Sequence, residues 1–455
     1  MERFDSIYFL GIGGIGMSAL ARYFLFKGYK VAGYDRTPSH ITDALVAEGA
    51  EICFDESPEL IPDYCRLPAS TLVVYTPAVP QSHSGFVFFR ENGFEIVKRA
   101  RLLGMITRSS KALCVAGTHG KTTTSCMLAN ILGTAPDGCN AFLGGILKNC
   151  NSNLMLSEKS DLTVIEADEY DRSFLQLSPY MAVITAADPD HLDIYGTEEE
   201  YLKGFADFTS LIRPGGVLLV RSGVKVKPRC AEGVRIFSFG DPDSDFHADN
   251  VRVGNGRIVF DFVASGRVVR DVDLGVPVRI NVYNAVAAMA IAMLNGADDD
   301  VLREGVASFR GVERRFDFWI KSDRVVLLDD YAHHPDEVKA SLQSVRELYP
   351  DRHITVVFYP HLYSRTRDFA PQFAEALSLA DRVILLPIYP AREAPIEGVS
   401  SEIILDALTC REKEICPMEG LLDRIREGHF DVLMTMGAGD VDRFLPSIKE
   451  ILLDK

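Results

Sequence analysis

The chain has 455 residues, of which 47% are apolar and 25% charged, a composition typical of globular enzymes. Its 48 Lys and Arg against 64 Asp and Glu leave a formal charge of −16 without a basic block, which argues against a nucleic-acid partner. No apolar run reaches the ~20 residues of a membrane span, no signal peptide is evident, and the nine cysteines are scattered without a C-x-x-C, so we expect a cytoplasmic protein with free thiols and no membrane partner.

The first predicted unit begins with a strand at residues 7–10, directly before Gly11-Ile12-Gly13-Gly14-Ile15-Gly16. A helix follows to about residue 26, and a second strand at 29–34 ends at Asp35. This order is the G-x-G-x-x-G fingerprint of a dinucleotide-type site, where the glycine turn holds a pyrophosphate and the acidic residue a ribose. The loop recognises pyrophosphate and not nicotinamide, so the identity of the nucleotide stays open. A strand at 71–75 ends at Thr76-Pro77, and the unit closes near residue 107.

A second unit starts with the apolar strand 112–116, which runs into Gly117-Thr118-His119-Gly120-Lys121-Thr122. The strand, the glycine turn ending in Lys-Thr and the helix start predict a phosphate loop for ATP, in which backbone N–H groups and the lysine hold phosphate oxygens and the threonine can ligate Mg²⁺. Val115 stands where the common loop has its first glycine, so the match is to the shorter G-x-x-G-K-T. The alternative is a strand–helix turn with an incidental lysine.

Two acidic clusters follow predicted strands of this second unit. Residues 166–171 (EADEYD) end the strand 162–166, and Asp190-His191-Leu192-Asp193 comes after the strand 181–184. Ligands of open α/β sheets lie beyond the carboxyl ends of the strands, so we expect Glu166 and His191 to hold Mg²⁺ beside the phosphate loop. For Asp193 we favour a solvated acidic turn. Small antiparallel strands are predicted over 246–275 and a helix over 282–294.

The third unit opens after Arg314-Arg315, a guanidinium pair that could neutralise a transferring phosphoryl group or form a surface ion pair. Strands are predicted at 325–331, 354–358, 382–386 and 431–436. Asp329, Tyr331, His333 and His334 gather at the end of the first of these strands, and His361, Tyr363, Ser364, Arg365 and Arg367 after the second. Such basic and aromatic groups suit a carboxylate-bearing substrate. His333-His334-Pro335 could instead be only a helix start.

Eight segments, in this order, resemble the Mur ligase family of ATP-dependent amide ligases in cell-wall precursor synthesis. They are GIGGIGMSALA (11–21), AGTHGKTTT (116–124), EADEYDRSFL (166–175), DPDHLDIYG (188–196), GVERRFD (311–317), DDYAHHP (329–335), PHLYSRTRDF (360–369) and MGAGD (436–440). The resemblance covers essentially the whole chain and implies an α/β protein of three domains. These are a Rossmann-like UDP-binding domain (1–107), a central P-loop ATPase-like domain with a parallel sheet (108–310) and a C-terminal Rossmann-like α/β domain that closes with the amino acid (311–455).

The resemblance is closest to members that join L-alanine to UDP-N-acetylmuramate, and it favours UDP over NAD at the first loop. It implies ATP and Mg²⁺, with two ions, as cofactors. The residues that it assigns to the UDP-sugar are Gly11, Gly13, Gly14, Ile15, Gly16, Ser18, Asp35, Thr76 and Pro77. Those assigned to ATP are Gly117, Thr118, His119, Gly120, Lys121, Thr122, Thr123, Asn284 and Arg315. Thr122, Glu166 and His191 are assigned to Mg²⁺, and Tyr331, His333 and Arg365 to the amino acid. Lys121, His191, Arg315, His333 and Arg365 are the expected catalytic residues.

Two positions depart from the family pattern. Ile280 stands where the family often has a histidine before the adenine-contacting segment, and Leu362 stands where it often has an arginine, which leaves the choice among alanine, serine and glycine open. Lys203 lies where sister ligases carry a carbamoylated lysine, but we do not expect that modification here. The alternatives are a recycling ligase that attaches a murein tripeptide to the same UDP-sugar, an NAD-dependent oxidoreductase and a non-catalytic nucleotide-binding regulator. The sequence leaves monomer and homodimer equally open.

Overall fold

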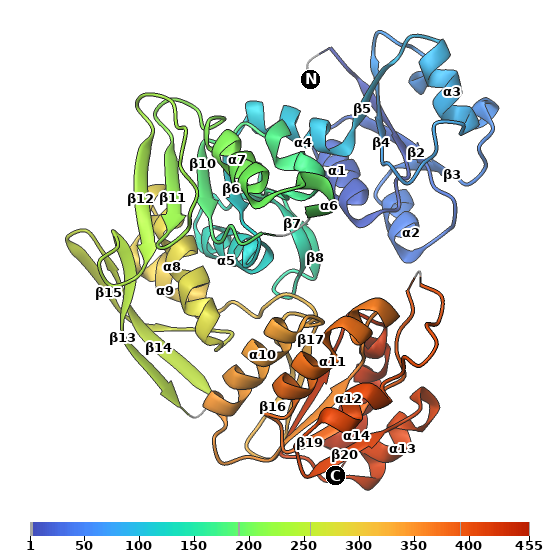
Figure 1. Ribbon diagram of the computed structural model, residues 1–455. Coiled ribbons are helices and arrows are strands. Elements are labelled where there is room, and N and C mark those ends of the chain that lie inside the picture. The colour runs from blue at the N-terminus through green and yellow to red at the C-terminus, as the bar shows by residue number, and fades with distance from the viewer. Residues whose placement is uncertain (1–2, 190–191, 255, 392, 455) are drawn as a thin grey trace. The chain divides into compact units, whose positions relative to one another are not determined.

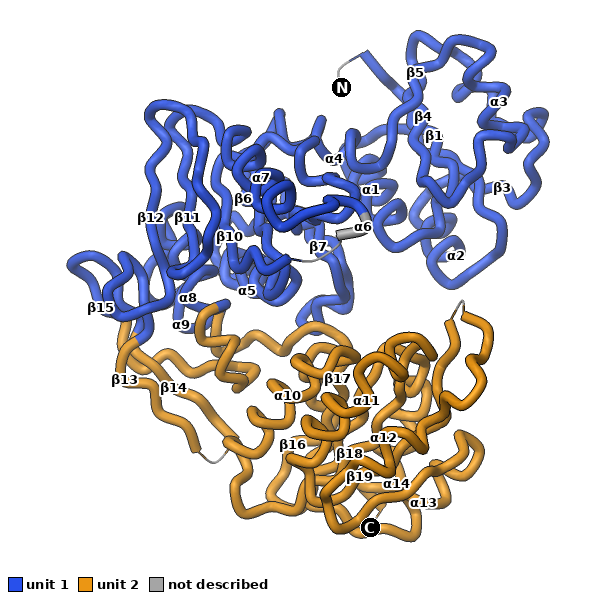
Figure 2. The backbone as a smooth tube through the Cα atoms, in the orientation of Figure 1, with its two compact units in different colours: residues 1–248, 262–268, 284–305 blue, residues 249–261, 269–283, 306–455 orange. Residues whose placement is uncertain are grey.

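The computed structural model describes residues 3–189, 192–254, 256–391 and 393–454 (Figure 1). Strands and helices alternate along the chain and build three β-sheets of five, ten and six strands, which confirms the α/β fold class. The chain divides into two compact units, coloured separately in Figure 2. Unit 1 comprises residues 1–248, 262–268 and 284–305, and unit 2 comprises residues 249–261, 269–283 and 306–455. The expected boundaries at residues 107 and 310 stay predictions.

The first sheet has the order β3-β2-β1-β4-β5, and all of its strands are parallel. The strand order reverses between β1 and β4, so this is the switch point at which a doubly wound sheet binds its ligand. The strands are β1 (Ser6–Leu10), β2 (Lys30–Tyr34), β3 (Glu51–Cys53), β4 (Thr71–Tyr75) and β5 (Glu95–Lys98), and the helices are α1 (Ile15–Phe26), α2 (His40–Ala47), α3 (Ser84–Glu91) and α4 (Arg99–Arg108).

The ten-stranded sheet has the order β15-β14-β13-β12-β11-β10-β6-β9-β7-β8. Its strands are β6 (Lys111–Ala116), β7 (Asn140–Leu147), β8 (Ser152–Met155), β9 (Leu162–Glu166), β10 (Met181–Ile184), β11 (Val217–Arg221), β12 (Arg235–Gly240), β13 (Phe246–Gly254), β14 (Arg257–Ala264) and β15 (Arg267–Asp273). β6 lies between β9 and β10 and is parallel to both, so the phosphate loop that follows β6 has a strand end on either side. The helices of this region are α5 (Lys121–Thr134), α6 (Leu192–Tyr195), α7 (Glu198–Thr209), α8 (Arg279–Leu294) and α9 (Asp299–Ala307), with a 3-10 segment η3 (Tyr170–Gln176).

The third sheet, in unit 2, has the order β16-β17-β21-β18-β19-β20. Only β16 is antiparallel to its neighbour, so the carboxyl ends of β17, β21 and β18 meet side by side at one edge. The strands are β16 (Asp317–Lys321), β17 (Val326–Asp330), β18 (Ile354–Phe358), β19 (Arg382–Leu385), β20 (Glu412–Ile415) and β21 (Val432–Met436). The helices are α10 (Pro335–Leu348), α11 (Tyr363–Leu377), α12 (Glu402–Ala407), α13 (Leu421–Glu427) and α14 (Leu445–Leu453).

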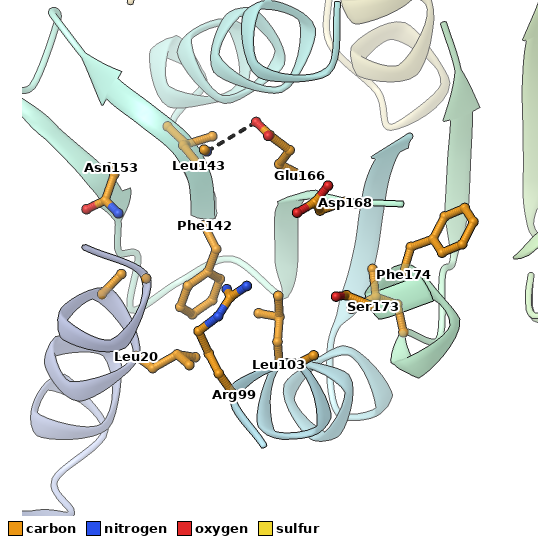
Figure 3. A pocket seen from close by; sticks show the side chains of 15 residues that line it. Leu20, Arg99, Leu103, Phe142, Leu143, Asn153, Glu166, Asp168, Ser173 and Phe174 are labelled. Carbon is orange, nitrogen blue, oxygen red and sulfur yellow. Dashed lines mark hydrogen bonds between the residues drawn. The ribbon is translucent and has the colours of Figure 1, made fainter. Parts of the chain in front are cut away.

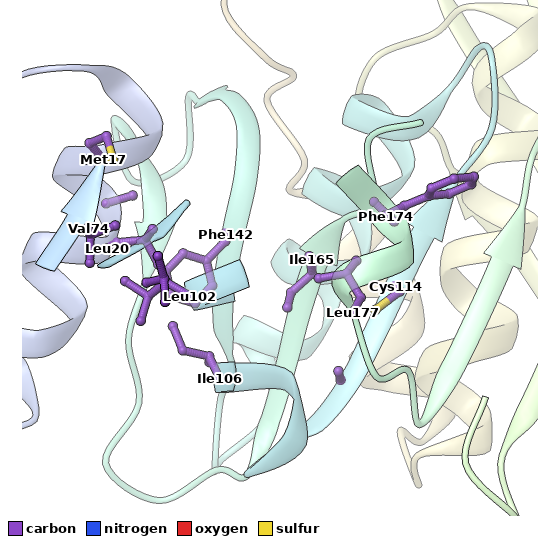
Figure 4. Packing of buried hydrophobic residues seen from close by; sticks show 14 of the residues in the cluster. Met17, Leu20, Val74, Leu102, Ile106, Cys114, Phe142, Ile165, Phe174 and Leu177 are labelled. Atoms are coloured by element: carbon purple, nitrogen blue, oxygen red, sulfur yellow. The ribbon is translucent and has the colours of Figure 1, made fainter. Parts of the chain in front are cut away.

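One hydrophobic cluster runs through unit 1 from the first sheet to the second (Figure 4). Leu20 of α1 and Leu102 of α4 belong to it together with Phe142 of β7 and Ile165 of β9, and each of these side chains is at most 7% exposed. The first sheet and the part of the ten-stranded sheet that lies in unit 1 therefore share one core. Burying each apolar side chain of this size stabilises the fold by about 1.5–3 kcal/mol. Among the described residues, no helix combines the length and the apolar character that crossing a membrane requires.

Close packing inside unit 1 makes one glycine substitution testable. Gly104 lies within α4, and a Cβ there would meet the backbone carbonyl oxygen of Gln176 at 2.1 Å. Alanine normally favours a helix interior by about 1 kcal/mol over glycine, but here the carbonyl cannot move aside like a side chain. We expect Gly104→Ala to lower the free energy of unfolding by about 1–3 kcal/mol.

Thermal unfolding measures this effect, and Gly133→Ala is the matched control. Gly133 is also helical, but its Cβ would meet only the flexible methyl group of Met155, at 2.8 Å. The control is therefore expected to keep or raise the melting temperature. Equal stability of the two variants would contradict the close approach of α4 to residue 176.

Candidate active site

The first glycine loop lies at the switch point of the first sheet, as the fingerprint predicts. Gly11 follows β1 with φ +86°, and a Cβ there would stand 2.6 Å from Cγ2 of Thr76, which follows β4. The Asp35 carboxylate accepts a hydrogen bond from the backbone N–H of Gly13 at 2.7 Å. One of its oxygens therefore holds the loop in shape, a use that the fingerprint alone does not indicate. Its contact with a ribose stays a prediction.

The start of α1 presents a mixture of exposed and internally bonded groups. Gly14 precedes the helix in extended conformation, and Ile15, its first residue, is 56% exposed. The Ser18 hydroxyl is buried and donates to the carbonyl oxygen of Ile15 at 2.9 Å. The Asn153 side chain from β8 donates to the same carbonyl at 3.2 Å. The backbone around Ile15 is thus held by its own helix and by the second sheet.

The phosphate loop has the backbone that its sequence requires. Gly117 and Gly120 have φ of +144° and +82°, and α5 begins at Lys121. A Cβ on Gly117 would lie 2.1 Å from the Thr185 hydroxyl, so only glycine fits beside the strand end of β10. The Lys121 ammonium donates to the Gly117 carbonyl at 2.7 Å. It therefore lies folded over its own loop.

Glu169 was not among the residues predicted for this site, although the acidic segment 166–171 that contains it was. The two oxygens of its carboxylate lie 2.9 and 2.7 Å from the Lys121 ammonium, and its side chain is 1% exposed. Burial raises the pKa of Glu169, and the charge of Lys121 opposes that rise. The signal was present in the sequence, because Glu169 belongs to the acidic cluster after β9, the neighbour of β6, but the cluster alone does not say which of its carboxylates faces the lysine.

The expected metal site is described only in part. The Glu166 carboxylate accepts from the backbone N–H of Gly144 at 3.2 Å, and a Cβ on Gly144 would lie 2.3 Å from it. Thr122 is half-buried in the first turn of α5. His191 lies outside the described residues. Within the described part of the chain, no group of three or more His, Cys, Asp and Glu side chains is arranged to hold a metal ion.

Asn284 of α8 lies beside the phosphate loop, and its contact with an adenine stays a prediction. Its side-chain oxygen accepts from the Thr124 hydroxyl at 3.1 Å and would stand 2.9 Å from a Cβ on Gly120. Thr118 donates from its hydroxyl to the Asp188 carbonyl at 2.8 Å. These contacts hold the loop between α8 and the chain that follows β10.

A pocket in unit 1 joins the first helix to the acidic strand end (Figure 3). Gly16 and Leu20 line it from α1, Glu166 and Asp168 from the end of β9, and Arg99 from the start of α4. Figure 3 shows the Arg99 side chain pointing into this space. A Cβ on Gly16 would lie 3.1 Å from the Arg99 guanidinium. Arg99 stands in no recognisable motif, so its place in this pocket could not be predicted from the sequence.

In unit 2, the two arginines of the expected pair differ in their surroundings. Arg314, with φ +60°, donates to the Gly437 carbonyl at 2.7 Å and lies 3.2 Å from Asp442 and 3.4 Å from Asp329. Arg315 is exposed, and its guanidinium lies 5.6 Å from the centre of the Tyr331 ring. Among the described residues, Arg315 makes no ion pair within 4 Å. Arg314 is therefore structural, whereas Arg315 can meet a ligand.

The histidine cluster forms where β17 and β18 end. The rings of His333 and His361 lie 5.9 Å apart, and Tyr331 lies 5.1 Å from His333. Burial lowers the pKa of His333, so its ring is neutral at neutral pH. His334 immediately precedes α10, and its backbone N–H donates to Glu337 at 3.2 Å. His334 thus begins a helix, while His333 faces the cluster.

Two polar atoms of this cluster are buried without a hydrogen-bond partner in the described structure. They are Nδ1 of His361 and Nη1 of Arg365. An unpaired buried polar atom costs about 1–3 kcal/mol, and such atoms in a native protein call for an explanation. Burial, followed by repulsion from a protonated His333 and from the Arg365 guanidinium, lowers the pKa of His361 to about 4. The cluster therefore has the donors and the local positive potential that an anionic group needs.

The sheets, the phosphate loop and the charged strand ends define a multidomain α/β nucleotide-dependent enzyme. Family models for the Mur ligase family catalytic domain, the Mur ligase middle domain and the Mur ligase glutamate ligase domain match residues 6–111, 115–292 and 314–439. The chain belongs to the Mur ligase family, whose members form amide bonds with ATP.

Curated relatives that match this chain over nearly its whole length share one name. The UDP-N-acetylmuramate–L-alanine ligases of Phocaeicola vulgatus and Porphyromonas gingivalis are 58% and 53% identical to this chain, over 99% and 98% of it and 98% of each relative. The crystal structure of UDP-N-acetylmuramate-alanine ligase from Thermotoga maritima matches with a TM-score of 0.77 at 27% identity, covering 99% and 98% of the two chains. A murein peptide ligase from Psychrobacter arcticus shares the fold with a TM-score of 0.64 at 21% identity over 98% of both chains.

The depressed pKa of His361 predicts a pH-dependent stability. In the unfolded chain a histidine binds a proton below about pH 6.5, whereas in the fold His361 stays neutral down to about pH 4. The unfolded state therefore binds more protons between these values, and stability falls as the pH drops from about 6.5 towards 4. Melting temperatures across this range check the expectation. In His361→Asn the decline should be shallower, and an unchanged slope would show that other groups cause it.

Proposed function

We propose that this chain joins L-alanine to the lactyl carboxylate of UDP-N-acetylmuramate, with ATP converted to ADP and phosphate. One observation carries the proposal: a phosphate loop with its lysine in place adjoins a strand end whose carboxylate lines a pocket leading to the first glycine loop. This arrangement suits the joining of a sugar nucleotide to a second substrate through phosphoryl transfer. The two ligases compared above at more than 50% identity carry the same activity in their names.

The described residues fit ATP. Gly117 and Gly120 form a cradle that a Cβ at either position would fill, and such a loop presents backbone N–H groups to phosphate oxygens. Lys121 would contact the terminal phosphates, Thr118, His119 and Thr123 would complete the loop, and Asn284 would contact the adenine. Arg315, exposed in unit 2, would neutralise charge on the γ-phosphoryl group.

The donor set also fits Mg²⁺, which takes oxygen ligands. Thr122 and Glu166 supply a hydroxyl and a carboxylate from neighbouring elements, and we assign the second of two ions to His191. When bound, Mg²⁺ would neutralise the charge that develops on the phosphoryl oxygens.

The chemistry follows from the poor leaving ability of a carboxylate oxygen. An oxygen of the lactyl carboxylate attacks the γ-phosphorus, ADP leaves, and an acyl phosphate forms. The amine of L-alanine then attacks the acyl carbon, and the tetrahedral intermediate expels phosphate. His333 is our candidate for the base that takes the amine proton, because burial keeps its ring neutral at neutral pH. Lys121 and Arg315 would bear the charge of phosphoryl transfer.

The sugar nucleotide would occupy unit 1. We propose that its diphosphate lies at Gly11, Gly13, Gly14, Ile15 and Gly16, where α1 presents backbone N–H groups, with Ser18, Asp35, Thr76 and Pro77 nearby. Arg99 faces the same helix start from the pocket and would pair with an anionic group of the sugar nucleotide.

The amino acid would bind in unit 2, where Arg365 carries an unpaired buried donor for a carboxylate and His361 an unpaired buried ring nitrogen that donates in one of its two tautomers. Tyr331 and His333 would line the same place. The tripeptide-adding alternative is not favoured, because the murein peptide ligase is the more distant match in both TM-score and identity. A cytoplasmic location and a monomeric or homodimeric state remain part of the proposal.

Phosphate release tests the activity. ATP, Mg²⁺ and UDP-N-acetylmuramate are combined with L-alanine, glycine, L-serine or the murein tripeptide in separate reactions. We expect release to require the sugar nucleotide and to be fastest with L-alanine. Lys121→Ala should reduce kcat by at least about 100-fold while the sugar nucleotide still binds, because the lysine acts on transition-state charge. Release only with the tripeptide would move the assignment to the recycling ligase.

Arg99 gives a prediction specific to the pocket. Removing one charge-assisted contact to an anion costs about 1.5–3 kcal/mol, so Arg99→Ala should raise KM for UDP-N-acetylmuramate by about tenfold or more. KM for ATP should change little, since Arg99 lies beside α1 and not on the phosphate loop. Steady-state kinetics with each substrate varied in turn measure both constants. An unchanged KM for the sugar nucleotide would remove Arg99 from the site.

A further inference from the structure

The Lys121–Glu169 contact is the most completely buried ion pair in the described part of unit 1. The Lys121 ammonium lies 2.7 and 2.9 Å from the two carboxylate oxygens, and the two side chains are 15% and 1% exposed. Most other ion pairs of this unit join more exposed side chains, and those of Arg22 and Glu48, for example, are 24% and 42% exposed. Pairs of that surface kind contribute little, whereas a buried carboxylate must be matched by a partner.

Glu169 is held firmly from behind. Its backbone carbonyl accepts from the Tyr195 hydroxyl at 2.7 Å and from the Arg172 N–H at 3.0 Å. Asp171 and Arg172 adopt left-handed conformations with φ of +51° and +55°, which non-glycine residues rarely do. Strain of this kind persists where the surroundings impose it, and it gathers at functional sites. The strained turn after β9 therefore fixes the position of Glu169.

The stability of the fold does not require the Lys121–Glu169 ion pair. A buried ion pair can often be replaced by apolar side chains without loss of stability, so the stability of the fold gives little reason for a carboxylate here. Asp168 adds a like charge beside it and makes the ionised form of Glu169 still less favourable. An arrangement this unfavourable indicates a role for the position of the lysine.

The remaining contacts of Lys121 show what that role is. Its ammonium also donates to the Gly117 carbonyl at 2.7 Å and lies 3.5 Å from the Thr118 carbonyl, both on the loop that would receive phosphates. An ammonium has three donors. With one directed at the fixed Glu169, the other two can exchange loop carbonyls for phosphate oxygens without the side chain leaving its place.

We propose that Glu169 is a positioning residue that anchors the Lys121 ammonium over the phosphate loop, so that bound nucleotide meets a preoriented cation. The inference rests on the proposed use of ATP. In the alternative role, Glu169 would compete with the nucleotide for the Lys121 ammonium. The two roles predict opposite changes in nucleotide affinity when Glu169 is replaced. Preorientation lowers the cost of binding, whereas competition raises it.

The test is a double-mutant cycle read by calorimetric titration with a non-hydrolysable ATP analogue, which requires no turnover. Glu169→Gln keeps the shape of the side chain and removes its charge. We expect it to weaken analogue binding by about tenfold, the size of one charge-assisted contact, and Lys121→Ala to weaken it at least as much. The double variant should bind no more weakly than Lys121→Ala alone, because Glu169 acts through the lysine.

Kinetics and controls separate this role from a structural one. Glu169→Gln should lower kcat by about tenfold or more while KM for UDP-N-acetylmuramate stays unchanged, and Glu169→Asp should restore part of the loss. Glu48→Gln, which removes a surface partner of Arg22, should alter neither. Tighter analogue binding by Glu169→Gln, additive effects in the cycle, or a lowered melting temperature with normal binding would each overturn the proposal. If the wild-type chain forms no product, the proposed ligase activity fails, while the binding cycle still decides the role of Glu169.

Discussion

The candidate site depends on one constraint, the parallel register of β6 with its two neighbours. Val115 pairs with Glu166 of β9, and Ala116 pairs with Ile184 of β10. The phosphate loop therefore leaves its strand with a carboxylate on one side and Thr185 on the other. The Thr185 hydroxyl donates to the Ala116 carbonyl at 3.2 Å and occupies the space that a side chain at position 117 would need. The packing of the sheet thus requires glycine at 117 independently of any bound phosphate.

The same strands meet two opposite demands. Their interiors contribute Cys114, Ile165 and Ile184 to the large apolar cluster of unit 1, each at most 1% exposed. Glu166, Glu169 and the phosphate loop with Lys121 follow their carboxyl ends, and the charges of these side chains are costly to bury. The closely packed apolar interiors of the strands keep the charged side chains at the strand ends in fixed positions. In unit 2, Asp329 at the end of β17 shows the same cost, because burial raises its pKa to about 6.

Much of this could be predicted from the sequence, because short-range patterns determine it. Apolar runs gave the parallel strands, and the glycines at 11 and 117 marked turns that the structure places in left-handed or otherwise restricted backbone. Contacts between distant residues were harder to predict. Glu169 meets Lys121 across 48 positions, and Arg99 faces α1 from a helix without a motif, so neither partner can be identified before the chain folds. Asp35 was selected, but its bond to Gly13 was not anticipated.

Leu362 shows how a departure from a family pattern acts through the backbone. It precedes α11 with φ +72°, a backbone conformation that residues other than glycine rarely adopt. Its N–H donates to the Tyr389 carbonyl at 2.9 Å. The His361 ring stacks on Tyr389 at 5.7 Å. The backbone at 362 therefore helps to orient His361, while the leucine side chain supplies no charge. Under the proposed function, an amino-acid carboxylate would bind the unpaired Nη1–H of Arg365 beside His361, and selectivity for the amino-acid side chain would come from the shape around them.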